Sequence, residues 1–160
     1  MTWTRLRHAI IQVLFNQIVV GVPFVYVGYK LEVWRGNEWN TQLPTFQRAV
    51  VDFTVFIIVE EIGFYYFHRF LHYHRIYRYI HKKHHEWTSP IAVAAVYCHP
   101  IEHILSNYLP VFLGPFIMGS HLATSWAWYL LSTFTAINSH SGYHFPLFPS
   151  PEAHDFHHQK

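Results

Sequence analysis

Charged side chains and cysteine are scarce in this sequence. Asp, Glu, Lys and Arg make up 12% of its 160 residues, about half of the ~25% typical of soluble domains. So few charges cover a water-exposed surface poorly. The single cysteine, Cys98, excludes a disulfide-stabilised scaffold. The formal net charge of +2 gives no broad basic surface, so we expect no nucleic-acid partner.

The apolar residues are gathered in runs. Residues 103–151 contain no Asp, Glu, Lys or Arg, and a membrane-spanning helix needs roughly 20 mostly apolar residues. This stretch therefore accommodates two helices, separated at Gly119-Ser120-His121. The pattern predicts an all-α integral membrane protein with about four transmembrane helices in two hairpins. The four runs cover residues 9–29, 49–67, 101–118 and 122–138.

Two other interpretations of these runs stay open. Buried core helices of a soluble protein are one, because Pro23, Pro110 and Pro115 interrupt the first and third runs. A signal peptide is the other for residues 9–29, although this run is long and lacks a small-residue cleavage site. Four runs together with so few charges favour a membrane, because a chain this short has little interior in which to bury them.

A basic segment indicates the orientation in the membrane. Residues 69–83 contain five Lys or Arg, and residues 62–85 contain no acid. The positive-inside rule places such a segment in the cytosol. Two hairpins then start and end on the cytosolic side, so residues 68–85 and 140–160 share one face of the membrane.

Histidine is abundant, with 15 residues against 11 Lys and Arg. Ten of them form two H-x-x-x-H and two H-x-x-H-H patterns, and on a helix positions i, i+3 and i+4 share one face. Each pattern therefore aims two or three imidazoles at one point. Neutral imidazole is a common ligand of iron and zinc. The ten candidate metal ligands are His68, His72, His81, His84, His85, His140, His144, His154, His157 and His158.

The number of candidate ligands favours two metal ions. A structural zinc site is tetrahedral and usually uses cysteine, whereas ten imidazoles exceed the need of one such ion and Cys98 matches no zinc pattern. Soluble di-iron bundles use Glu and Glu-x-x-His, and no Glu-x-x-His occurs here. Two ions that share the histidines therefore fit the pattern better than one zinc ion or a carboxylate di-iron site. We expect them to lie where the helices leave the bilayer.

The order of these motifs carries a resemblance to a known family. The chain is similar to the fatty acid hydroxylase/sterol desaturase superfamily of membrane di-iron oxygenases, and within it to the C4-methylsterol-oxidase-like branch. The resemblance covers most of the chain. The segments that carry it are residues 79–86 (YIHKKHHE), 99–102 (HPIE), 140–143 (HSGY) and 154–158 (HDFHH).

The resemblance implies a lipid monooxygenase of the endoplasmic reticulum membrane, multi-pass, with its metal site facing the cytosol. It implies two Fe ions, for which Zn can substitute in expressed protein, O2 as co-substrate, and electrons from NAD(P)H through a separate cytochrome b5 or reductase. C4-methylsterol-oxidase-like activity is the first expectation. Fatty acid hydroxylase, sterol desaturase and alkylglycerol monooxygenase activities on a sterol or acyl lipid share these ligands. Residues 69–83 face lipid headgroups or help to dock an acidic cytochrome b5.

Four further residues are candidates for supporting the metal ligands, and no catalytic residue beyond the metal centre is expected. Glu61 lies on one helical stripe with His68 and His72. A carboxylate there either orients a ligand imidazole or faces water beside Arg69. The other three candidates border the motifs and are Glu86, His99 and Asp155.

Two alternatives lie outside an active oxygenase. One is a histidine-rich membrane protein that binds haem or metal without catalysis. The other is an inactive fragment, because Lys160 follows His158 by two residues whereas the family continues further. We therefore expect residues 1–160 to be a single fatty acid hydroxylase-type membrane domain, truncated at the C-terminus and with an abrupt N-terminus.

Overall fold

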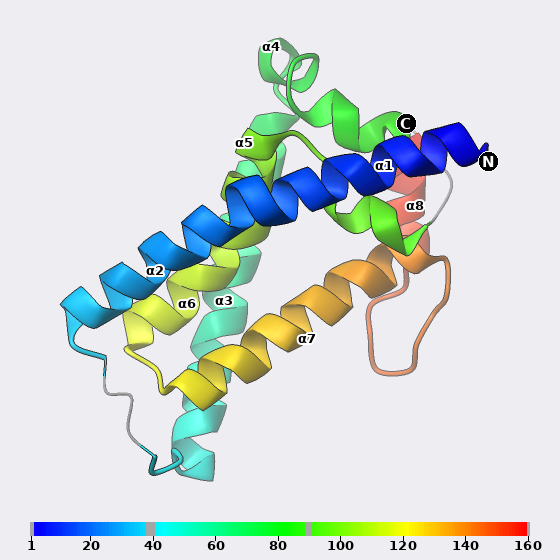
Figure 1. The fold of residues 1–160 in the computed structure, drawn as a ribbon. Coiled ribbons are helices and arrows are strands. Elements are labelled where there is room, and N and C mark those ends of the chain that lie inside the picture. Colours follow the sequence, from blue (N-terminus) through cyan, green and yellow to red (C-terminus); the bar gives the residue numbers. More distant parts are fainter. Residues whose placement is uncertain (1, 38–40, 89–90, 160) are drawn as a thin grey trace.

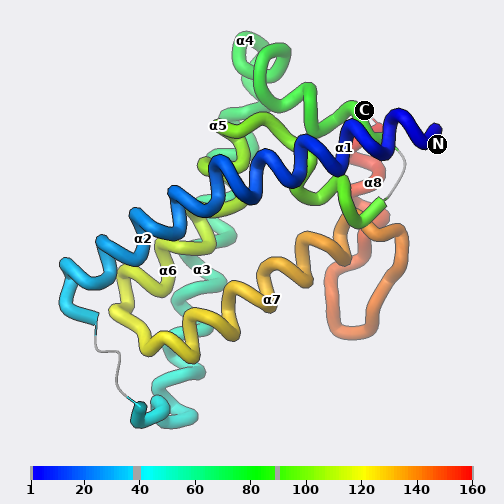
Figure 2. Tube along the Cα trace, viewed as in Figure 1, coloured from blue at the N-terminus to red at the C-terminus, as the bar shows by residue number. Residues whose placement is uncertain are grey.

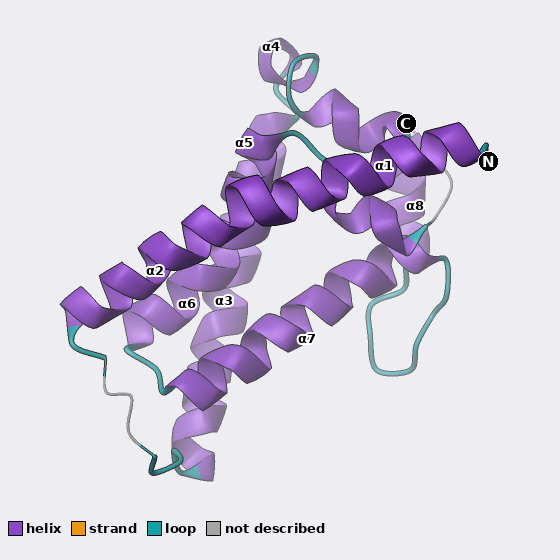
Figure 3. Ribbon diagram, viewed as in Figure 1, coloured by secondary structure: helices purple, strands orange, loops and turns teal. Residues whose placement is uncertain are grey.

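The computed structural model describes residues 2–37, 41–88 and 91–159, and within them every regular element is a helix (Figure 1, Figure 3). The prediction of an all-α fold is confirmed. In chain order the elements are α1 (Trp3–Phe15), the π-helical η1 (Asn16–Gly21), α2 (Val22–Arg35), α3 (Phe46–Leu71), α4 (His74–Tyr77), the 3-10 helices η2 (His81–Glu86) and η3 (Ala92–Val96), α5 (Pro100–Glu102), the π-helical η4 (His103–Tyr108), α6 (Leu109–Met118), α7 (Leu122–Ser141) and α8 (Glu152–Gln159).

The first three elements form one continuous helix, Trp3–Arg35, drawn in blue in Figure 2. It begins where the Thr2 hydroxyl accepts a hydrogen bond from the backbone N–H of Arg5. It ends at Gly36, whose φ of 81° needs the freedom of glycine. The π-helical η1 ends at Gly21, two residues before Pro23, so a wider turn precedes a residue that donates no backbone hydrogen bond.

The helix built from α5, η4 and α6 repeats this arrangement. Its π-helical segment η4 ends two residues before Pro110, and η4 packs against η1. The Tyr108 hydroxyl donates to Oε1 of Gln17 across this contact, at 2.7 Å. The two π-helical segments therefore bring polar side chains together between two otherwise apolar helices.

Close packing joins α3, α6 and α7. Gly114 on α6 lies against Phe56 on α3, where an added Cβ would come within 2.8 Å of the Phe56 Cα. Trp128 on α7 packs edge-on and tilted against Phe53 and Phe56, and its indole N–H donates to the Val111 carbonyl at 3.0 Å. The aromatic residues thus hold three helices together around one small residue.

The predicted hairpin break between the last two apolar runs is present. α6 ends at Gly119, whose φ is 59°, and α7 begins after His121, whose Nδ1 accepts from the Ala123 backbone N–H. Two arginines from other helices close the end of α6, because Arg35 donates to the Ile117 carbonyl and Arg48 to the Met118 carbonyl.

Of the four predicted transmembrane helices, one has the length and composition needed to cross a membrane. Among the described residues, only Trp3–Arg35 is both long and apolar enough to cross a membrane. The reason is clearest in α3, where every window of 18 residues contains at least three charged side chains, Glu60 and Glu61 among them. In α7 the serines, threonines and indoles lower the mean hydropathy.

Candidate metal centre

Two groups of four histidines converge in the structure. The first histidine group consists of His68, His72, His81 and His157, and the second of His84, His140, His154 and His158. Within each group, one ring nitrogen from every residue lies within 4.8 Å of the others. The sequence patterns are therefore divided between the groups, because α8 and η2 each supply ligands to both.

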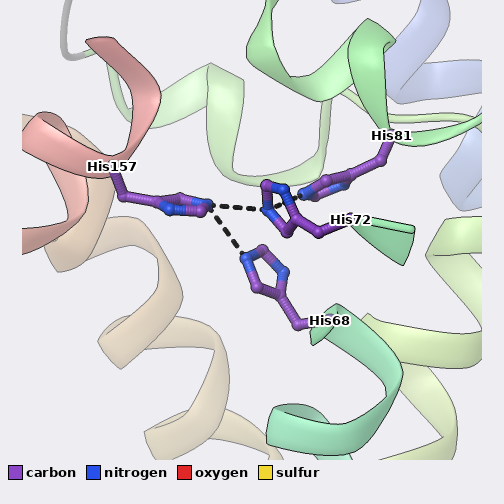
Figure 4. A group of neighbouring side chains, drawn as sticks. All are labelled: His68, His72, His81 and His157. Carbon is purple, nitrogen blue, oxygen red and sulfur yellow. Dashed lines mark hydrogen bonds between the residues drawn. The ribbon is translucent and has the colours of Figure 1, made fainter. Parts of the chain in front are cut away.

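The first histidine group is assembled from three parts of the chain (Figure 4). His68 and His72 stand one turn apart at the C-terminal end of α3, which is the spacing that places two side chains on one helical face. Nε2 of His157, on α8, lies 3.0 Å from Nε2 of each. His81, at the start of η2, places its Nε2 3.0 Å from that of His72.

The second histidine group follows the same design. His154 and His158 lie one turn apart on α8, with their Nε2 atoms 3.0 Å apart. His140, in the last turn of α7, places its Nε2 2.8 Å from that of His154. His84, in η2, completes the group with its Nε2 3.3 Å from that of His140.

His85 lies between the two groups. Its Nε2 is 3.1 Å from that of His81, and its ring stacks on that of His158 with centroids 4.6 Å apart. The structure thus brings together nine of the ten predicted ligands.

His144 is the tenth and lies outside both groups. Its side chain is exposed, and its ring N–H donates from Nε2 to the Phe148 carbonyl at 3.2 Å. The prediction placed it on one helical face with His140. However, α7 ends at Ser141, and Gly142 adopts a left-handed φ of 76°. The chain therefore leaves the helix before position i+4 is reached.

The hydrogen bonds of the buried rings leave their Nε2 lone pairs facing one another. His84 donates from Nδ1 to the Tyr97 carbonyl at 3.2 Å, and His140 donates from Nδ1 to the Ala136 carbonyl at 2.9 Å. A neutral imidazole carries one N–H, so Nε2 of both residues is a bare acceptor. Two lone pairs 3.3 Å apart repel each other unless a cation lies between them.

The spacing of the nitrogens suits a transition metal. Metal–imidazole bonds of about 2.0–2.1 Å place neighbouring ligand nitrogens roughly 3.0–3.4 Å apart. The closest Nε2–Nε2 pairs here lie 2.8 to 3.3 Å apart, and all ligand nitrogens of a group lie within 4.8 Å of one another. The residues present therefore fit two metal ions, one per histidine group.

Burial keeps these imidazoles in the neutral form that binds metal. Burial, and next the neighbouring imidazoles, lowers the pKa of His81 and of His154 to about 2 and that of His85 to about 3. Burial also lowers the pKa of His84 well below its usual value. Because a metal ligand must be deprotonated, the site is prepared for cation binding at neutral pH.

In the described part of the chain, none of the four residues predicted to support the ligands hydrogen-bonds an imidazole of either histidine group. Glu61 is exposed, and Glu86 accepts from the Tyr97 hydroxyl at 2.7 Å. His99 caps α5 by accepting from the Ile101 backbone N–H. Asp155 is partly exposed and acts on His158 only through space.

One supporting residue escaped the sequence analysis. The buried Glu102 accepts a hydrogen bond on Oε1 from Nδ1 of His81, at 2.7 Å. Its signal in the sequence was its position as the last charged residue before the long charge-free stretch at 103–151.

Comparison with known proteins agrees with the motifs. The chain is 48% identical to fatty acid hydroxylase domain-containing protein 2 of Macaca fascicularis, over 98% of the chain and 47% of that protein. It is 41% identical to fatty acid hydroxylase ahd1 of Mycosarcoma maydis, over 98% of the chain and 41% of that protein. A Dictyostelium discoideum protein, provisionally named a methylsterol monooxygenase, is 32% identical over 98% of the chain and 61% of its own length.

The chain spans about half the length of the first of these relatives, and no solved structure matches it. The four histidine motifs also predict a similarity to fatty acid hydroxylase domain-containing protein 2, and this prediction is confirmed. The sequence profile described as fatty acid hydroxylase matches residues 53–160, which include all ten motif histidines. The chain therefore belongs to the fatty acid hydroxylase family.

Proposed function

We propose that this chain carries the metal centre of a di-iron, O2-dependent lipid monooxygenase with C4-methylsterol-oxidase-like activity. The observation that carries the proposal is the convergence of two sets of four Nε2 atoms, which fits one ion in each histidine group. When bound, two irons would supply the activation of O2 for insertion of one oxygen atom into an unactivated C–H bond. The histidines hold the ions, and no other catalytic side chain is required.

The surroundings of the second histidine group support a lipid substrate. A small recess beside it is lined by Trp87, Ile91 and Ala94, and it reaches His140 and His158. Trp87 and Ala94 are buried together in one apolar cluster. Apolar walls of this kind exclude water from the metal ligands, as oxidation of an unactivated C–H bond requires.

The outer surface supports a membrane location. Ile18, Val22 and Val25 on the long first helix are each 62% exposed, and such a continuous apolar face is unusual on a soluble monomer. The lipid bilayer is the solvent that this face suits. We place the protein in the endoplasmic reticulum membrane, with the histidine groups on the cytosolic side.

Electrons have to come from another protein in this scheme. Reduction of the second oxygen atom of O2 to water needs two electrons, for which we propose NAD(P)H through cytochrome b5 or a reductase. Four exposed basic residues lie close in sequence to the first histidine group and suit an acidic redox partner. They are Arg69, Arg75, Arg78 and Lys82.

Two measurements test the proposal. Detergent-purified protein should contain about two irons per chain, and expression in membranes that lack sterol C4-demethylation should lower their 4-methylsterols in a mass spectrum. Unchanged 4-methylsterols with fully iron-loaded protein would overturn the sterol substrate. Lipid profiling of the same membranes then reveals a hydroxylated acyl chain or a cleaved alkylglycerol. Haem, or a single structural zinc, in place of two irons would overturn the oxygenase itself.

A further inference from the structure

Glu102 is the one carboxylate that hydrogen-bonds a histidine of either group within residues 2–37, 41–88 and 91–159. It is 3% exposed, and its Oε1 lies 2.7 Å from Nδ1 of His81, which is fully buried. A buried carboxylate is costly unless it is paired. The pairing with His81 is the side-chain hydrogen bond that Glu102 makes on Oε1, whereas Oε2 has no partner in the described part of the chain.

Local structure presents this carboxylate to the histidine. Glu102 is the last residue of the short α5, which begins at Pro100 and is capped by the His99 imidazole. The π-helical η4 follows immediately. The side chain is thus held at the start of the α5–η4–α6 helix, opposite the first residue of η2.

The hydrogen bond determines which nitrogen of His81 faces the first histidine group. A metal ion on Nε2 of His81 favours the ionised form of Glu102. An ionised carboxylate only accepts, so Nδ1 of His81 then carries the proton and Nε2 supplies the lone pair. That Nε2 lies 3.0 Å from Nε2 of His72 and 3.1 Å from Nε2 of His85. A carboxylate on the far nitrogen also makes the imidazole a stronger metal ligand.

Among the residues that the structure describes, no charged group forms an equivalent hydrogen bond to the second histidine group. His84 and His140 both donate from Nδ1 to neutral backbone carbonyls, those of Tyr97 and Ala136. Asp155 lies near His158, but it is partly exposed and joined to it by no hydrogen bond in the described part of the chain. Solvent screens such a charge more strongly than it screens Glu102.

We propose that Glu102 is a positioning residue that makes the first histidine group the tighter of two unequal metal sites. It acts by fixing the orientation of His81 and by placing a buried negative charge behind that ligand. This inference rests on the proposed function, because it assumes one ion in each group.

The test is a metal titration of the full chain in detergent, with Co²⁺ as the probe and absorbance as the readout. Glu102→Gln keeps the size of the side chain and an oxygen acceptor while removing the charge. Glu86→Gln is the matched control, because Glu86 is the last residue of η2 and its carboxylate accepts from the Tyr97 hydroxyl, with no imidazole partner among the described residues. We expect two binding steps in the wild type. Glu102→Gln should weaken the tighter step about 10–100-fold, leaving the weaker step and the Glu86→Gln titration unchanged.

A double variant separates positioning from a general structural effect. If Glu102 acts through His81, Glu102→Gln should add no further loss of Co²⁺ affinity in a His81→Ala background. A further loss there, an equal weakening of both steps, or a Glu102→Gln titration that matches the wild type would overturn the inference.

The order of filling tests the inference without changing Glu102, in case that variant fails to fold. His84→Ala should leave the tighter step intact, whereas His68→Ala should abolish it. The opposite pattern, or two equal steps in the wild type, would overturn the inference and leave the proposed two-metal centre standing. A wild-type chain that binds no metal would overturn both.

Discussion

Asn16 donates both hydrogen bonds of its side-chain amide to the backbone on either side of Tyr97, at 3.2 Å to the Val96 carbonyl and 3.0 Å to the Cys98 carbonyl. The Tyr97 carbonyl in turn accepts from Nδ1 of His84. Asn16 is completely buried in the π-helical segment of the first helix. The first helix therefore holds the backbone that orients a predicted metal ligand.

Replacing this amide should destabilise the protein and loosen the second histidine group. In Asn16→Leu, the Val96 and Cys98 carbonyls lose the Asn16 donor, and Gln12 still donates to the Cys98 carbonyl. We expect a cost of about 1–3 kcal/mol. We expect a lower thermal midpoint in detergent and weaker binding at the Co²⁺ step that His84→Ala removes. Gln17→Leu is the matched control, because Gln17 is exposed in the same helical segment and accepts from the Tyr108 hydroxyl rather than from the backbone around Tyr97. Equal midpoints for the two variants would show that the buried amide has no special role.

His84→Ala and His144→Ala should differ in metal content. His84 is buried and faces His140, so its loss should reduce iron from about two ions per chain to about one. His144 is exposed on the loop after α7 and contacts the Phe148 carbonyl, so its loss should leave both ions in place. Mass spectrometry of the metal content in purified protein measures both. Loss of iron from His144→Ala would mean that the loop folds inward around bound metal.

Helical periodicity explains which parts of the site were predictable. His68 and His72, and likewise His154 and His158, lie one turn apart at helical positions, so spacing alone placed each pair together. The spacing failed at His144 because a left-handed glycine ends the helix first.

Tertiary pairing explains what the sequence left open. Local sequence does not predict that His81 lies beside His68 and His72 of the first group. It also does not predict that His84, three residues later, lies beside His140 of the second group. The same is true of Glu102, which meets His81 across a distance of 21 residues in the chain. Among the described residues, one of the four predicted membrane-crossing helices meets the length and composition criterion, and α3 does not because charges lie inside its apolar run.

The metal-free protein should lose stability as the pH falls. Burial holds the pKa of His81, His84 and His154 below the ordinary value of about 6.5. The unfolded chain therefore binds more protons than the folded chain below that pH, and acid favours unfolding. We expect the thermal midpoint in a chelator to be steady above about pH 7 and to fall progressively below about pH 6.5. Bound metal should shift this fall to lower pH, and a midpoint that rises on acidification would contradict the neutral, buried imidazoles.

The contact between α3 and α6 should not tolerate a larger side chain at Gly114. A Cβ there would lie 2.8 Å from the Phe56 Cα and 3.0 Å from its ring, and backbone on the opposing helix cannot move aside as a flexible side chain does. We expect Gly114→Val to cost about 1–3 kcal/mol, measured as a lower thermal midpoint and reduced yield of folded protein. Ala127→Val is the control. Ala127 is exposed on α7, so this substitution introduces the same branched side chain without a clash. The effect should reach the metal, since α3 carries His68 and His72 at its far end: Gly114→Val should lower iron content in proportion to the unfolded fraction, and Ala127→Val should leave it unchanged.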